Sequence, residues 1–445
     1  MTGLFCAPQS CRKKFRLPES VKICRIQIFY LMYPHSLLAG IPAFWYHLVR
    51  ILNERGCIRQ MITHARGRSP LYRVHELLSS VLSFFRSNVV LTIALIAAGI
   101  SMILVPPDAA YASYLDYKTL TCLFTTLAVI CALRNIHFFT TVAQKIVRMA
   151  GNLRMTVLSL VYITFIGSML IANDMALLTF LPLGYFALSS TGKDKYMAPT
   201  FILQNIAANL GGMLTPFGNP QNLYLYEKFM IPNGEFMTIL LVPFLVAVTL
   251  ITVCCLFFPK EKLTMGEKVD DKLPAGKTAL YLVLFASTLL VVFRVVPYAV
   301  GLVVIPLALM FSDRDALKQV DYPLLLTFVA FFIFAGNMSR IDAVNNLFSF
   351  LLGKNTLLTA VASCQVISNV PSAILLSQFT DNYRALLMGV NIGGAGTLIA
   401  SLASLITFRE YTRHYPHMTA KYIGLFSAFN FGFLIVLTIV CSFLV

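Results

Sequence analysis

The sequence has 445 residues, of which 58% are hydrophobic and only 12% are charged, and its mean hydropathy is +0.76. This charged fraction is about half that of an ordinary soluble protein, and apolar runs close to the ~20 residues that cross a bilayer recur from Asn88 onward. The net charge of +16 lies in the first 77 residues and in short loops, which excludes a nucleic-acid-binding stripe. We therefore expect an all-α polytopic membrane protein in a lipid bilayer, with no nucleic-acid partner.

Residues 1–77 differ from the rest of the chain, because they hold its only tryptophan, Trp45, and 12 Lys and Arg against 3 acids. An apolar run at about 26–49 has the length of a span, but it would place the basic cluster that begins at Arg12 outside the cell, against the positive-inside rule. It also lacks the cleavage site of a signal peptide. We expect a basic N-terminal extension whose structure the sequence does not define, with Met61 as a candidate true start.

The apolar runs predict the order of the membrane segments. Nine spans are expected, at about 88–105, 116–133, 198–229, 237–258, 278–293, 296–311, 322–337, 383–407 and 421–444. Two further pieces, about 153–190 and 355–381, turn at "AND" and "SNV" and are predicted to form re-entrant hairpins. Residues 136–148 are amphipathic, which predicts a helix along the membrane interface, with a counterpart after Arg340.

Basic residues predict the orientation of these spans. Loops on one side hold most of the Lys and Arg of the core, including five lysines between Lys260 and Lys277. Cytoplasmic loops are the richer in Lys and Arg, so we expect the first core span to start from the cytoplasmic side of a cell membrane (plasma or inner). Loops on the other side hold six: Lys118, Lys228, Arg294, Arg340, Lys354 and Arg384.

Three pairs of segments match in the same order along the chain. "LDYKTLTCLFTTLAVICALRNI" from Leu115 resembles "VDYPLLLTFVAFFIFAGNMSRI" from Val320, "SMLIANDMALLTFLPL" from Ser168 resembles "CQVISNVPSAILLSQF" from Cys364, and "NLGGMLTPFGNPQNL" from Asn209 resembles "NIGGAGTLIASLASL" from Asn391. An odd number of spans separates the copies, which gives them opposite orientations and predicts the inverted repeat of secondary transporters. The first repeat is expected at 78–258, a solvated cytoplasmic linker at 259–277, and the second, inverted repeat at 278–445.

The segment "GGMLTPFGNPQNL" from Gly211 interrupts a predicted span with glycines and prolines, which disfavour a helix. Lipid offers no hydrogen bonds, so the freed backbone must be buried in protein or line a watery cavity. A single break of this kind is commonly a proline kink. The second copy breaks at the matching place, Gly393–Thr397, without a proline, and this coincidence favours a binding site.

Two kinds of ligand suit such broken helices. The N-termini of half-helices attract carboxylates or oxyanions, whereas free carbonyls and side-chain oxygens suit a small cation such as Na⁺. No Lys or Arg stands among the motifs, so an anion would be held by helix dipoles, amides, hydroxyls and any bound cation. The candidate substrate- and ion-binding residues are Asn173, Asp174, Thr215, Pro216, Gly218, Asn219, Pro220, Ser368, Asn369, Gly396, Thr397 and Ser401.

Asp174 breaks the symmetry of the two hairpin tips, because the second tip has Val370 at this position. An acid deep in a membrane is unfavourable by about 2.5–3.5 kcal/mol on insertion scales. One interpretation is that Asp174 lies shallow and caps a half-helix. The other is that Asp174 couples transport to a cation, either by binding Na⁺ near Asn173 and Asn369 or by carrying a proton.

The segments "AND…FLPL", "GGMLTPFGNPQNL", "SNVP" and "GGAGTLIASLASL" resemble the ion-transporter superfamily of citrate-transporter-like permeases, arsenite-pump and sodium–proton antiporter permeases, and divalent anion–sodium symporters. The likeness runs from about Asn88 to Val445. It implies that hairpin tips and unwound helices form the substrate and cation sites, that a transport domain moves against a scaffold in an elevator-like cycle, and that the protein is a homodimer. The tips Ala172-Asn173-Asp174 and Ser368-Asn369-Val370 depart from the Ser-Asn-Thr of the symporters, which favours the antiporter and arsenite-permease side.

The sequence therefore predicts a secondary active transporter of a small anion, a di- or tricarboxylate such as citrate or an oxyanion, coupled to Na⁺ or H⁺ and using no other cofactor. One alternative is a Na⁺/H⁺ antiporter in which Asp174 exchanges the two cations. Another is the membrane channel subunit of an ATP-driven arsenite or oxyanion pump, which would need an ATPase partner because the chain carries no complete nucleotide loop. An enzyme is not expected, because the spans hold no catalytic or metal-ligating cluster.

Overall fold

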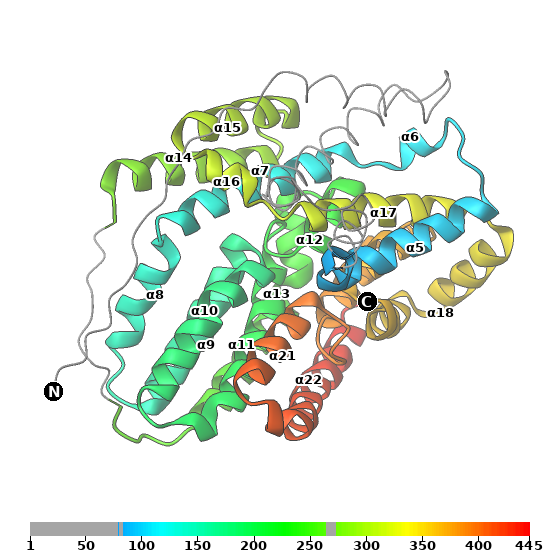
Figure 1. Ribbon diagram of the computed structural model, residues 1–445. Helices are drawn as coiled ribbons and strands as arrows, with labels where there is room; N and C mark the ends of the chain where they lie inside the picture. Colours follow the sequence, from blue (N-terminus) through cyan, green and yellow to red (C-terminus); the bar gives the residue numbers. More distant parts are fainter. Residues whose placement is uncertain (1–78, 80–82, 264–272) are drawn as a thin grey trace. The chain divides into compact units, whose positions relative to one another are not determined.

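The computed structural model describes residue 79, residues 83–263 and residues 273–445 (Figure 1). Contacts divide the chain into two units, Met1–Leu77 and Leu78–Val445, and the described residues belong to the second unit. The predictions for residues 1–77, including a start at Met61, lie outside the described residues.

Within this part of the chain, all regular structure is helical apart from one isolated antiparallel bridge between Asn152 and Lys262. Seven segments are long and apolar enough to cross a membrane, and two shorter apolar helices accompany them, so the prediction of an all-α polytopic membrane protein is confirmed. The long segments are α7 (Tyr117–Asn135), α9 (Leu153–Ile171), α13 (Asn233–Leu256), α14 (Ala275–Val292), α17 (Tyr322–Ser339), α18 (Asp342–Ile367) and Pro416–Ser442, which contains α22 (Thr419–Ser442); the shorter helices are α5 (Val89–Leu104) and α15 (Tyr298–Ser312).

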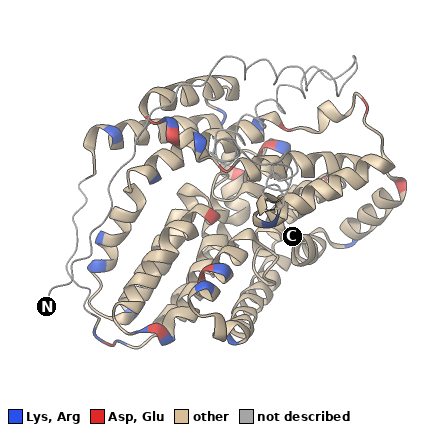
Figure 2. Cartoon of the chain, in the orientation of Figure 1, with Lys and Arg blue, Asp and Glu red and all other residues tan. Residues whose placement is uncertain are grey.

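Each of the nine predicted spans coincides with helix in the structure. Their ends differ by at most four residues, except that the helix predicted to end at residue 407 continues to His414. Two of them are divided in the middle, into α11 (Met197–Gly211) and α12 (Pro220–Lys228), and into α20 (Tyr383–Ile392) and α21 (Leu402–His414). Figure 2 shows that Lys, Arg, Asp and Glu are sparse along the helices and gather mainly near helix ends and in loops. This distribution leaves apolar helix surfaces for lipid.

Two helical hairpins occupy the pieces that turn at "AND" and "SNV". In the first, α9 packs beside α10 (Asn173–Ser189) (Figure 1). In the second, α18 packs on α19 (Asn369–Leu376). A single residue makes each turn: Ala172 has φ 65° and ψ 151°, and Ser368 has φ 76° and ψ 159°. Positive φ is uncommon in residues other than glycine, so both tips share the same strained geometry. Whether the hairpins are re-entrant stays a prediction.

The amphipathic segment before the first hairpin forms α8 (Phe138–Arg148), which buries Ala143 and Val147 and leaves Val142 and Ile146 exposed. A similar segment precedes the second hairpin, because α18 has non-helical angles at Asn355, with φ −161° and ψ 100°. The Asn355 side chain accepts a hydrogen bond from the Leu358 amide (2.9 Å) and so caps the helix that follows. The predicted counterpart after Arg340 is therefore the helix over 342–354.

In the segment Pro259–Leu263 of the predicted solvated linker, Lys260 and Lys262 are exposed, but the backbone is bonded to neighbouring helices. The Glu261 carbonyl accepts a hydrogen bond from the Leu153 amide (2.8 Å), and Arg154 Nε donates to the Phe258 carbonyl (2.7 Å). The Glu261 carboxylate also pairs with Lys193, next to α11. This segment, which we call the strap, therefore ties the end of α13 to the base of the first hairpin. Residues 264–272 of the predicted linker lie outside the described residues.

Candidate functional site

The two broken helices form the centre of the fold. α11, α12 and α20 are buried on nearly all sides, which is the environment of a helix enclosed by other helices. α11 ends in a short 3₁₀ turn, Gly212–Leu214, and a hydrogen-bonded turn over residues 215–218 follows it. α12 then begins at Pro220, where proline needs no N–H donor. α20 ends at Ile392, and helix resumes only at Leu402. Both interruptions fall where the sequence predicts them.

In the first break, one amide group satisfies the carbonyls that the ended helix leaves free. Asn222 Nδ2 lies 3.2 Å, 3.1 Å and 3.3 Å from the carbonyl oxygens of Gly212, Met213 and Thr215. A Cβ on Gly218 would collide with the Gly212 carbonyl, so glycine permits this close approach. The break is thus a defined structure with its backbone groups bonded. Pro216 is buried within it.

In the second break, Gln365 performs the same role from the neighbouring hairpin. Its Nε2 donates to the carbonyls of Gly393 (2.9 Å) and Ala395 (3.1 Å), and its Oε1 accepts from the Thr397 amide (2.8 Å). Gly396 has φ +122°, and a Cβ there would collide with the Gln365 side chain. Gln365 was not among the site residues predicted from the sequence.

Each hairpin tip binds the break of its own half at corresponding residues. The backbone N–H of Asn173 donates to the Gly218 carbonyl (3.2 Å), and the backbone N–H of Asn369 donates to the Ala400 carbonyl (2.9 Å). A second pair of bonds follows the same pattern: Thr215 Oγ1 donates to Met169 O (2.9 Å), and Thr397 Oγ1 donates to Gln365 O (3.1 Å). Donors and acceptors in both pairs occupy matching positions in the segments aligned above. Ser368 Oγ adds a bond to Ala400 O (3.2 Å).

The two breaks are also bonded to each other. Asn219 Nδ2 donates to Asn391 Oδ1 (3.4 Å), and Ser401 Oγ donates to Asn209 Oδ1 (2.7 Å). Asn219 and Ser401 correspond in the sequence pairing, as do Asn209 and Asn391. Asn173 Nδ2 also reaches Asn209 Oδ1 (3.2 Å), so the first hairpin tip joins the same cluster. We call these five residues the central amide cluster, and all five are buried.

Asp174 lies outside this cluster, in an adjacent cavity of about 70 Å³. Thr126 from α7, Pro220 from α12 and Asp321, the N-cap residue of α17, line the same cavity among mainly apolar side chains. Within residues 83–263 and 273–445, neither Asp174 Oδ1 nor Thr126 Oγ1 has a hydrogen-bond partner, although both atoms are buried. The carboxylate therefore faces a small space in which it could meet a cation or a proton.

Comparison with known proteins places the chain in a family. A family model described as citrate transporter matches residues 77–383, more than half of the chain. The chain belongs to this citrate transporter family. A protein of Methanocaldococcus jannaschii named as an uncharacterized transporter is 34% identical over 297 residues, which cover 66% of this chain and 81% of the relative. The inner membrane protein YbiR of Escherichia coli is 28% identical over 328 residues, with 71% and 85% covered.

Membership in the citrate transporter family confirms the resemblance to the ion-transporter superfamily, and together with the apolar helices it makes the chain a multi-pass membrane transporter. The family match ends at residue 383. It therefore includes both hairpins and the first break, whereas the second break and α21 lie beyond it. Their place in the site rests on the contacts described above.

In this citrate transporter family member, the predicted site residues divide among three places. Asn173, Asn219 and Ser401 meet in the central amide cluster, whereas Asp174 and Pro220 line the cavity. The remaining predicted residues form the breaks and tips: Thr215, Pro216, Gly218, Ser368, Asn369, Gly396 and Thr397. Among the residues that the structure describes, the Asp174 carboxylate bonds neither Asn173 nor Asn369, and a Na⁺ ion shared by these three residues stays a prediction. Asn209 and Asn391 were missed, although each directly precedes "LGG" or "IGG" in the quoted repeat.

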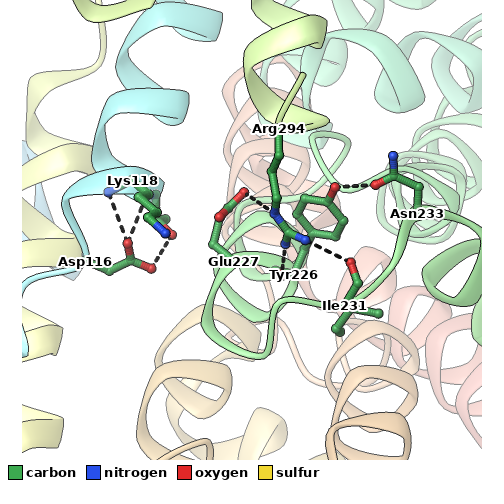
Figure 3. Close-up of polar contacts among 8 residues, drawn as sticks. Asp116, Lys118, Tyr226, Glu227, Ile231, Asn233 and Arg294 are labelled. Atoms are coloured by element: carbon green, nitrogen blue, oxygen red, sulfur yellow. Dashed lines mark hydrogen bonds and ion pairs between the residues drawn. The ribbon is translucent and has the colours of Figure 1, made fainter. Parts of the chain in front are cut away.

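The far end of α12 is held by a cluster around Arg294, in the turn between α14 and α15 (Figure 3). Arg294 Nε lies 3.2 Å from Glu227 Oε1, and its other nitrogens donate to the carbonyls of Tyr226 and Ile231. The guanidinium also stacks 3.8 Å from the centre of the Tyr226 ring. The Glu227 side chain is only 4% exposed, so this is a largely buried ion pair between two groups of helices.

Proposed function

We propose that this protein is a secondary active transporter of a small anion, a di- or tricarboxylate such as citrate or an oxyanion, coupled to Na⁺ or H⁺ by alternating access. The observation that carries the proposal is the matched bonding of the two breaks, in which Asn219 and Ser401 each reach across to the other half. A proline kink could explain only the first break, because the second break contains no proline and still makes corresponding bonds. Two related breaks at one centre are typical of transporter binding sites.

The chemistry of this centre suits an anion. Four helices, α10, α19, α12 and α21, begin at the hairpin tips or directly after the breaks, and helix N-termini carry partial positive charge. The side-chain amides of Asn173 and Asn369 add donors without a full charge. Such a site can hold a carboxylate or oxyanion and still release it, which transport requires.

Asp174 supplies the coupling in this proposal. Its carboxylate lines the cavity beside the tip of the first hairpin, so a cation or proton there would neutralise it next to the anion site. The start of the first core span in the cytoplasm, the elevator-like movement and the homodimer belong to the same proposal, supported by the distribution of basic residues and by the resemblance stated above.

Thermal unfolding of the purified protein tests the proposal. The protein is heated with citrate, succinate, arsenite, sulfate or tungstate, each with and without Na⁺ and at two pH values. A ligand at 100 times its dissociation constant stabilises a folded protein by about 2.7 kcal/mol. Stabilisation by one anion, increased by Na⁺ or by low pH, supports the proposal, whereas stabilisation by none of them contradicts it.

The unpartnered Asp174 carboxylate also favours a second candidate, a Na⁺/H⁺ antiporter. In that case Na⁺ alone should stabilise the protein, and the effect should disappear in Asp174→Asn. The pump-subunit hypothesis differs from both, because it requires ATP and a soluble ATPase for any transport in proteoliposomes.

A further inference from the structure

A second, larger cavity lies between the end of α7, the start of α8 and one side of α10. Its volume is about 590 Å³, and six of its ten lining residues are polar or basic. We call it the vestibule. Its polar and basic lining residues are Arg134, Asn135, His137, Thr140, Gln144 and Thr179.

Arg134 is a partly buried cation in the vestibule, and no ion pair joins it to a carboxylate within residues 83–263 and 273–445. Its Nη2 donates to Gln319 Oε1 (3.2 Å), a neutral acceptor, and its Nη1 lies 3.9 Å from Met175 Sδ. No carboxylate in the described part of the chain pairs with it, and nearby Asp313 instead accepts from Asn135 Nδ2 (3.0 Å). A planar guanidinium with free donors is well suited to carboxylates and oxyanions.

The vestibule adjoins the cavity of Asp174. Leu178 lines both spaces, and Met175, which contacts Arg134, lines the cavity of Asp174. Met175 and Leu178 stand one and four residues after Asp174 on α10, so one helix carries both sites. The vestibule and the cavity of Asp174 are therefore neighbours along α10, with Leu178 in the wall of both.

We infer that the vestibule is an anion-binding subsite in which Arg134 holds a carboxylate or oxyanion before it reaches the central site. The inference rests on the proposed function as an anion transporter. It places a full positive charge on the path of the anion, whereas the hairpin and break motifs contain no Lys or Arg. The phosphate of a lipid headgroup has the same chemistry and is the other source of such an anion.

Equilibrium binding of radiolabelled citrate and sulfate to the full chain in detergent tests the inference. Arg134→Gln should raise the dissociation constant of the bound anion about tenfold, since a charge-assisted hydrogen bond of this kind contributes about 1.5 kcal/mol or more. Arg134→Lys should fall between Arg134→Gln and the wild type, because lysine keeps the charge and loses the fork. Arg148→Gln is the matched control, as Arg148 is exposed at the end of α8 and does not line the vestibule.

The outcomes separate this inference from the proposed function. A wild-type protein that binds neither anion overturns both. If the wild type binds and Arg134→Gln binds equally well, only the vestibule is overturned. If Arg134→Gln fails to fold, the single variants Thr179→Val and Arg134→Lys provide the test. An unchanged dissociation constant in both variants overturns the vestibule as an anion subsite.

Lipid discs distinguish the two sources of the anion. Binding is repeated in discs of phosphatidylcholine alone and of phosphatidylcholine with phosphatidylglycerol, and bound phosphatidylglycerol is counted by native mass spectrometry. Citrate affinity that depends on Arg134 in phosphatidylcholine alone supports the substrate subsite. Loss of bound phosphatidylglycerol in Arg134→Gln, with citrate affinity unchanged, assigns the vestibule to a headgroup and overturns the substrate role.

Discussion

Gly396 has a backbone angle that side chains with a Cβ rarely adopt, and the Gln365 side chain occupies the space where that Cβ would lie. Gln365 in turn bonds three backbone groups of the second break. The shape of the break therefore depends on a glycine and a glutamine that belong to different elements. A side chain at Gly396 would displace Gln365 and free those groups.

Gly396→Ala should lower the free energy of unfolding by about 2 kcal/mol, because positive φ is strained for alanine. Anion transport should fall further than the stability loss explains, since the break is part of the proposed site. Thermal unfolding and uptake into proteoliposomes measure the two effects. Gly353→Ala is the control, because Gly353 is an exposed helical glycine with open space around it, and it should be neutral or stabilising.

Asp174→Asn removes an ionisable group from the cavity while keeping its size. We expect accumulation of the anion against its gradient to stop, because no charge remains for the coupling ion to neutralise. Anion binding should persist, since the central amide cluster is unchanged. Uptake driven by a Na⁺ or proton gradient, with anion binding measured in parallel, tests this; Asp315→Asn on the exposed surface is the control. Gradient-driven uptake equal to the wild type would contradict the coupling role.

At this scale, the sequence predicted residues that stand in glycine- or proline-rich motifs, such as Asn173, Asn219 and Ser401. It missed Asn209, Asn391 and Gln365, because each lies inside an apolar helical run where a polar residue carries no local signal. Their role comes from side chains of other elements that reach them. That information is three-dimensional, and pairing the two repeats was the only sequence signal that pointed to Asn209 and Asn391.

Arg294 and Glu227 join the α14–α15 turn to α12, and a largely buried pair of this kind leaves an uncompensated charge when one partner is removed. Arg294→Gln and Glu227→Gln should each lower the free energy of unfolding by about 3 kcal/mol. The double variant should be more stable than the sum of the single losses predicts. Chemical or thermal unfolding of the four proteins measures the coupling, and additive losses would show that the pair does not act as a unit.

The Glu261 carboxylate in the strap should make the stability of the folded protein depend on pH. Hydrogen bonds from Lys193 and Tyr196 hold the pKa of the Glu261 carboxyl below its ordinary value of 4.5. A lowered folded-state pKa stabilises the protein above the unfolded-state pKa, and this contribution is lost as the pH falls through the folded-state value. Glu261→Gln should therefore unfold at a slightly lower temperature than the wild type at pH 7. The difference should shrink below pH 4.5, and a constant difference would contradict the ion pair.

The helices lie where the sequence predicted them, because long apolar runs leave few alternatives in a bilayer. The strap was predicted as part of a solvated linker, because its lysines suggest solvent. Its attachment comes from main-chain groups of Glu261 and Phe258 and from one carboxylate, which composition does not reveal. The second hairpin was predicted to start at about residue 355, which coincides with the kink at Asn355.

For the molecule as a whole, the orientation in the membrane is the main untested prediction. Met149, between α8 and α9, and Met230, between α12 and α13, are both exposed and fall on opposite sides in the predicted topology. In intact cells, a membrane-impermeant maleimide should label Met230→Cys, whereas Met149→Cys should be labelled only after permeabilisation. Labelling of the unaltered protein gives the background, and the reverse pattern would invert the topology.

The central amide cluster makes the two halves of the chain incomplete without each other. Asn391 Oδ1 accepts from Asn219 in the first half, and Asn209 Oδ1 accepts from Ser401 in the second, so either half alone would lose these bonds where lipid offers none in exchange. With the opposite orientations predicted from the sequence, half of this chain could complete its own interior only by associating with a copy inserted in the reverse direction. Because the two halves are joined in one polypeptide, each translated chain supplies both orientations in equal number and no reversed copy is needed.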